Sequence, residues 1–73
     1  MTMRLPTVTA KAMTWALLRA GFVELRQRGS HRIFALATRR AIVPMHGGDL
    51  KPGTLKTILN AAGLTAAQLR DLL

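Results

Sequence analysis

The sequence contains no cysteine and only three acidic residues among its 73 residues. Without cysteine, disulfide bonds, thiolate zinc sites and thiol nucleophiles are excluded. The three acids, Glu24, Asp49 and Asp71, are too few to favour a carboxylate metal site or a paired-carboxylate hydrolase. Two histidines cannot form a three-histidine zinc site. We therefore expect neither a metal ion nor a cofactor.

Nucleotide-binding loops are also missing from the sequence, and we expect neither a membrane span nor a secretion signal. It has no Walker-type or GxGxxG loop, and no apolar run approaches the roughly 20 residues that a membrane span needs. Residues 1–11 are interrupted by Arg4, Pro6 and three threonines, so they lack the apolar block of a signal peptide. Small secreted domains usually need disulfides, and we therefore expect this chain to reside in the reducing cytoplasm.

Positive charge is present in large excess. Eleven Lys and Arg residues outweigh the three acids and give a formal charge of +8. Such a field attracts polyanions, of which nucleic acid is the first candidate. A membrane surface would call for one basic amphipathic helix, whereas the basic residues here are spread along the chain. An acidic protein partner is compatible with nucleic-acid binding.

Hydrophobic residues make up 49% of the chain, which favours one folded domain over residues 1–73, with residues 1–8 as a lead-in. Thr9 is a suitable N-cap for a helix over residues 10–20. We expect the apolar stripe of this helix to lie in the core together with Trp15. A second helix is expected from Pro52 to a stop at Gly63. The capping-box spacing of Thr65 and Gln68 predicts a short last helix.

Between the helices, the sequence predicts three antiparallel strands. They are expected at residues 22–28, 31–37 and 41–45, with turns at Gly29-Ser30 and at residues 38–40. The predicted fold is therefore α+β, with the order α-β-β-β-α and a short C-terminal helix. Since each long helix is apolar on one side only, both should pack on one face of the sheet and leave the other face open.

Histidine is the residue available for proton transfer near neutral pH. His31 follows the first predicted turn and has Arg26, Arg28 and Arg32 close by in the sequence. In RNA cleavage, an imidazole can take the proton of a ribose 2′-hydroxyl while arginine holds the phosphate. A lone histidine on a strand is often only structural or exposed, so spacing alone leaves both interpretations open.

Other polar residues also have more than one interpretation. His46 is compatible with proton transfer, with phosphate binding or with a loop histidine that bonds to the backbone. Ser30 fits a nucleophile or, more simply, a turn residue. Arg39, Arg40 and Lys51 fit either phosphate binding or a solvated surface. The candidate RNA-binding residues are Arg26, Arg28, Ser30, Arg32, Arg39, Arg40, His46 and Lys51.

Four segments carry a family resemblance. These are residues 26–34 (RQRGSHRIF), 43–47 (VPMHG), 50–55 (LKPGTL) and 62–64 (AGL). Their order and spacing make the chain resemble the HicA (YcfA-like) mRNA interferase toxins of type II toxin–antitoxin systems, over roughly residues 8–73.

The resemblance implies a fold similar to a double-stranded-RNA-binding domain and a metal-independent endoribonuclease that cleaves mRNA. It also implies that His31 is the catalytic residue and that a HicB antitoxin is the protein partner. His46 corresponds to a family motif residue whose role the resemblance leaves open. Two alternatives stand beside this one: a non-catalytic module that binds double-stranded RNA, and a protein-interaction subunit for an acidic partner.

Overall fold

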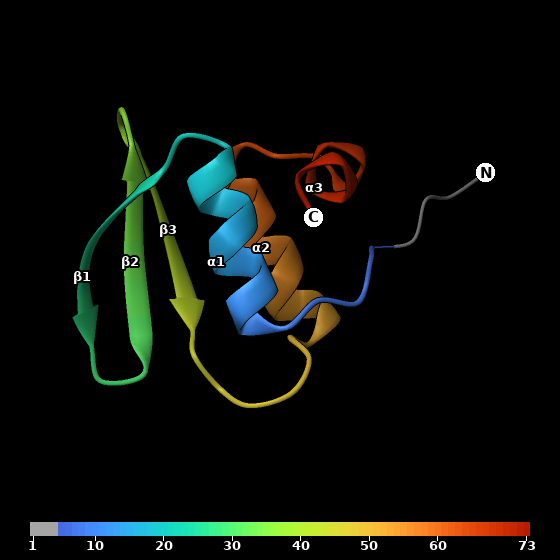
Figure 1. The fold of residues 1–73 in the computed structure, drawn as a ribbon, viewed down its shortest axis with the longest axis horizontal. Coiled ribbons are helices and arrows are strands. Elements are labelled where there is room, and N and C mark those ends of the chain that lie inside the picture. Colours follow the sequence, from blue (N-terminus) through green and yellow to red (C-terminus); the bar gives the residue numbers. More distant parts are fainter. Residues whose placement is uncertain (1–4) are drawn as a thin grey trace.

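A computed structural model describes residues 5–73, so residues 1–4 of the expected lead-in lie outside the described part. The elements, in order, are α1 (Ala10–Arg19), β1 (Val23–Arg28), β2 (His31–Leu36), β3 (Arg39–Pro44), α2 (Pro52–Ala62) and α3 (Ala66–Leu72) (Figure 1). This order confirms the predicted α+β fold and the short helix at its end.

The helices begin and end at residues with a clear capping chemistry. The Thr9 hydroxyl accepts a hydrogen bond from the Ala12 N–H at 3.1 Å and so caps α1. Gly63 ends α2 in the left-handed conformation, with φ 72°. Thr65 and Gln68 form the predicted capping box of α3. Within residues 5–73, no helix is long and apolar enough to cross a membrane.

The three strands form one antiparallel sheet in the order β1-β2-β3. The turn before β3 differs from the prediction of a turn at residues 38–40. Leu36 pairs with Arg39, so the turn is Ala37-Thr38 and β3 begins two residues earlier than expected. Ala37 adopts a φ of 53° in this tight turn, a conformation that favours glycine. Because the turn contains no glycine, the sequence did not predict this conformation.

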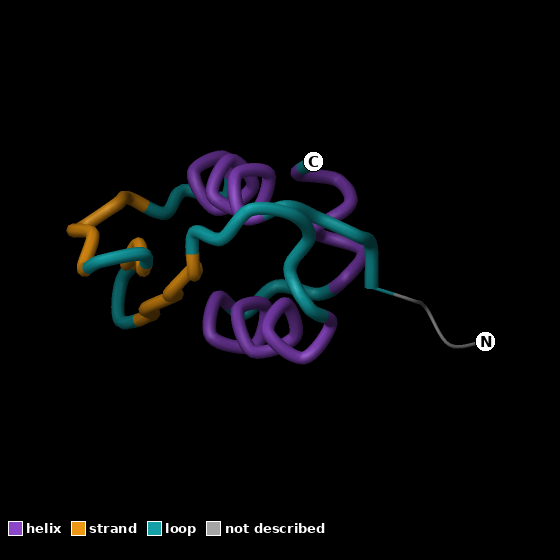
Figure 2. The backbone as a smooth tube through the Cα atoms, turned by 90° about the horizontal axis from the view of Figure 1, so that it is seen from below, coloured by secondary structure: helices purple, strands orange, loops and turns teal. Residues whose placement is uncertain are grey.

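The core lies between one face of the sheet and the helices. Phe34 and Val43, which project to the same face, are fully buried together with Met13 and Leu17 of α1 and Leu55 of α2. Figures 1 and 2 show α1 and α2 beside β3, with β1 farthest from the helices. All six residues of β1 are exposed, and the face of the sheet opposite the core is uncovered, as predicted.

The prediction that Trp15 belongs to the core is wrong, since its side chain is 53% exposed. The buried residues of α1 include Met13, Ala16 and Leu17. At 3.6 residues per turn, Trp15 falls on the opposite side of the helix from this stripe. There it borders a shallow hollow with Arg19 and Leu73.

Candidate active site

His31 is the first residue of β2, and its side chain is exposed. It follows the two-residue turn Gly29-Ser30, in which Gly29 adopts the left-handed φ of 59°. In the sheet, His31 lies opposite Arg28 of β1 and Pro44 of β3. Since paired residues project to the same face, Arg28 and Pro44 flank the imidazole.

A β-bulge in β1 determines which charged residues share the face of His31. The register shifts between Glu24 and Arg26, which leaves Leu25 as an extra residue. Side chains alternate along a strand, and an extra residue reverses the alternation beyond it. Arg26 and Arg28 therefore project on the uncovered face with His31, while Glu24 projects on the helix side. The bulge thus gathers two guanidinium groups and one imidazole on one surface.

The rest of this uncovered face is largely apolar. Ile33 and Ile42 pair with each other beside Arg26, and Val23 lies nearer the other end of β1. Val23 is 58% exposed and Ile42 is 50% exposed. We call the surface formed by Val23, Arg26, Arg28, His31, Ile33 and Ile42 the open face. It combines cationic groups that suit phosphate with aliphatic groups that suit a base or ribose.

Arg32 lies on the opposite side of the sheet from His31. Its Nε is 3.8 Å from Glu24 Oε2 and donates to Gln27 Oε1 at 3.4 Å. These contacts agree with the register, which places all three side chains on the helix side. Of the arginines expected to surround His31, the structure therefore brings Arg26 and Arg28 to its face but not Arg32.

Arg39 also projects on the helix side, where it packs against the end of α2. A methyl group added at Gly63 would come within 2.5 Å of Arg39 Cζ. A cation at this position is favourable because the C-terminal end of a helix carries partial negative charge. Arg39 therefore packs against the end of α2 and does not lie on the open face.

Arg40 projects on the same face as His31 but near the other end of the strands. It lies four residues from Pro44, the partner of His31, a separation of roughly 13 Å along the strand. Its Nη1 donates hydrogen bonds to the carbonyl oxygens of Ala37 at 3.0 Å and Arg39 at 2.9 Å. Arg40 is thus held on the same face as His31 but far from it.

His46 lies in the loop that follows β3, close to the Gly29-Ser30 turn that precedes His31. The Met45 N–H donates to the Ser30 carbonyl oxygen at 2.5 Å, which ties the start of this loop to the Gly29-Ser30 turn. Beyond it, the loop and the first turn of α2 enclose a pocket of about 390 Å³. This loop pocket is lined by Pro44, His46, Gly47, Gly48, Asp49, Leu50, Lys51 and Thr54.

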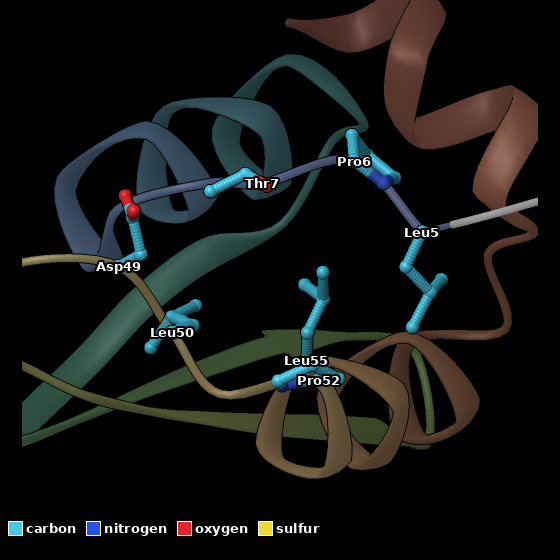
Figure 3. Close-up of a pocket in the computed structure, with 7 residues that line it drawn as sticks. All are labelled: Leu5, Pro6, Thr7, Asp49, Leu50, Pro52 and Leu55. Carbon is cyan, nitrogen blue, oxygen red and sulfur yellow. The ribbon is translucent and has the colours of Figure 1, made fainter.

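A second hollow, of about 470 Å³, shares Asp49 and Leu50 of this loop with the loop pocket (Figure 3). Its lining is mostly apolar and comes from the N-terminal segment, the loop and the start of α2. Asp49 lines both hollows, and Figure 3 shows its carboxylate turned towards the segment that leads into α1. This second hollow contains none of the residues predicted to act on RNA.

The open face therefore offers an accessible imidazole with two guanidinium groups, and the loop pocket adds a second imidazole and an ammonium group. Among residues 5–73, no three His, Asp or Glu side chains are grouped in a way that could hold a metal ion. This arrangement suits proton transfer at a bound phosphodiester.

Comparison of the chain with curated proteins gives no match. Comparison with protein families does: residues 10–64 match the family described as the HicA toxin of bacterial toxin–antitoxin systems. The matched segment includes the open face and the loop pocket and covers more than half of the chain. The protein thus belongs to the HicA toxin family, the toxin side of a bacterial toxin–antitoxin pair.

Proposed function

We propose that this toxin is an endoribonuclease that cleaves mRNA and thereby inhibits translation, with His31 as its catalytic residue. The observation that carries the proposal is the exposed His31 on an uncovered sheet face, accompanied there by Arg26 and Arg28. Neither arginine makes a hydrogen bond or ion pair with another described residue, so both guanidinium groups are available to a ligand. Membership of the HicA family supports the toxic role.

In the proposed reaction, His31 accepts the proton of a ribose 2′-hydroxyl, and the 2′-oxygen attacks the adjacent phosphorus. The O2′–P bond forms as the P–O5′ bond breaks, and a proton from solvent or from the imidazolium neutralises the departing 5′-oxygen. One product then ends in a 2′,3′-cyclic phosphate and the other begins with a 5′-hydroxyl. Because the substrate supplies its own nucleophile, this route requires no metal-bound water. Proton transfer of this kind typically contributes about 100- to 10,000-fold.

Arg26 and Arg28 hold the phosphate in this proposal. A guanidinium donates two parallel hydrogen bonds to phosphate oxygens and stabilises the charge that grows on them. On the neighbouring strands, Ile33 of β2 and Ile42 of β3 offer an apolar surface to the nucleoside. Arg40, which projects on the same side of the sheet as the open face, meets the same RNA farther from His31.

We also propose that a HicB-like antitoxin is the protein partner and that it covers the open face. We propose that both proteins reside in the cytoplasm, where mRNA is available. Leu25 is 52% exposed and lies beside the exposed Val23 in β1. A protein that buried these side chains would gain from removing apolar surface from water. The charge of +8 favours an acidic surface on that partner.

The reaction is tested with purified toxin and a defined single-stranded RNA, compared with the same RNA carrying one 2′-deoxyribose at the main cleavage position. We expect the first RNA to be cut to cyclic-phosphate and 5′-hydroxyl ends, and the second to resist cleavage at that position. Equal cleavage of both would show that the nucleophile is not the 2′-oxygen. Binding of duplex RNA with no cleavage of any RNA would establish the non-catalytic module instead.

A further inference from the structure

The loop pocket is a second concave site beside the proposed catalytic residue. We propose that it binds the phosphate of the nucleotide next to the scissile bond, through Lys51 and His46. This inference rests on the proposed function, because it assigns a further part of the same RNA substrate.

The position of the pocket relative to His31 is the first argument. Pro44 lines the pocket and is also the partner of His31 in the sheet. Paired residues in an antiparallel sheet have Cα atoms about 5 Å apart. The Met45–Ser30 hydrogen bond fixes the loop against the turn that precedes His31. A chain whose phosphodiester lies at the imidazole therefore reaches the pocket within one nucleotide.

The donors in the lining are the second argument. Lys51 contributes an exposed ammonium group, His46 an exposed imidazole and Thr54 a half-buried hydroxyl. Side chains at Gly47 and Gly48 would meet nothing within 4 Å, so the backbone there is open to close approach by a ligand. Phosphate oxygens accept hydrogen bonds from all of these groups.

Asp49 is the one acidic group in the lining, and it must be reconciled with an anionic ligand. Its backbone is held by an isolated bridge to Thr9, and its carboxylate is turned towards the segment before α1 (Figure 3). Asp49 thus lines the loop pocket, but its carboxylate is turned towards the segment before α1. Lys51 and His46 remain as the groups that select the ligand, and they select an anion.

Lys56 provides a matched control for Lys51. Both lysines are exposed and lie near the start of α2, but Lys56 borders a different hollow, with Leu59 and Asn60. Removal of either charge reduces the net charge by the same amount. A difference between the two variants therefore reports a local contact, whereas equal effects report only the general positive field.

The experiment measures binding of a fluorescent ten-nucleotide single-stranded RNA to protein that carries His31→Ala, as a function of salt. We expect Lys51→Gln to weaken binding about tenfold at low salt and to reduce the log–log salt slope by about 0.7. His46→Asn should weaken binding severalfold. Lys56→Gln should leave affinity and slope close to those of the parent. Equal losses for Lys51→Gln and Lys56→Gln would overturn the proposal.

Chemical shifts of backbone amides give a second measurement, because a local contact changes them at the pocket whereas the long-range positive field of the protein does not. In the same His31→Ala protein, addition of the RNA should shift the signals of Gly47, Gly48 and Thr54, and Lys51→Gln should reduce these shifts. If wild-type toxin cuts RNA but these signals do not move, the pocket assignment fails while the nuclease stands. If the signals move but wild-type toxin never cuts, the nuclease fails and the pocket stands.

Discussion

The opposite orientations of Arg28 and Arg32 predict that two neighbouring arginines affect RNA cleavage very differently. Arg28 projects on the open face, and its guanidinium group makes no hydrogen bond or ion pair with another described residue. Arg32 projects on the helix side, where it contacts Glu24 and Gln27. We therefore expect Arg28→Gln to impair cleavage and Arg32→Gln to impair only stability.

The magnitudes follow from these contacts. A charge-assisted hydrogen bond to phosphate contributes roughly 1.5–3 kcal/mol, so loss of Arg28 should lower kcat/KM by about 10- to 150-fold. Its removal leaves the free energy of unfolding almost unchanged, because it breaks no contact within the protein. The Arg32–Glu24 pair is exposed, and its loss should cost about 1 kcal/mol of stability or less.

The assay pairs kcat/KM on a fluorogenic single-stranded RNA with urea denaturation of the same protein samples. We expect Arg32→Gln to retain kcat/KM within about threefold, since only the long-range field changes. If both variants lowered kcat/KM by the same factor, the assignment of the RNA to one face of the sheet would be refuted.

Three further predictions concern stability. Gly63→Ala should lower the free energy of unfolding by about 1–2 kcal/mol, because its φ of 72° is left-handed and the guanidinium group of Arg39 must move aside; urea denaturation showing no loss would contradict this. Ala37→Gly should raise thermal stability by up to about 1 kcal/mol, since its φ of 53° favours glycine, and a lower melting temperature would contradict the strain. Phe34→Ala should cost about 3–5 kcal/mol, out of a total of about 4–11 kcal/mol for a domain of this length; a loss under 1 kcal/mol by circular dichroism would contradict its place in the core.

The sequence predicted the helices well because their ends depend on local chemistry. Thr9, Gly63 and the Thr65–Gln68 pair each act through backbone groups within a few residues, so their function is visible in the sequence. The sequence also predicted the turn at Gly29-Ser30, because glycine readily adopts the left-handed conformation that Gly29 has there. These local rules placed His31 at the start of a strand.

The remaining features depend on pairing between strands, which a single sequence does not reveal. The turn at Ala37-Thr38 contains no glycine, so Arg39 was predicted in a turn, although it lies in β3. The bulge at Leu25 has no signal in the sequence either, yet it reverses the faces on which the β1 side chains project. Sequence spacing therefore could not predict which arginines share a face with His31. The strand register identifies them as Arg26 and Arg28.

The role of His31 is tested by the kcat/KM of purified His31→Ala toxin on single-stranded RNA, measured beside wild type and together with the RNA dissociation constant. We expect kcat/KM to fall by at least about 100-fold while the dissociation constant changes by less than about threefold, because the imidazole moves a proton and the arginines hold the phosphate. Cleavage by His31→Ala at the wild-type rate would contradict the assignment of His31 as the catalytic residue.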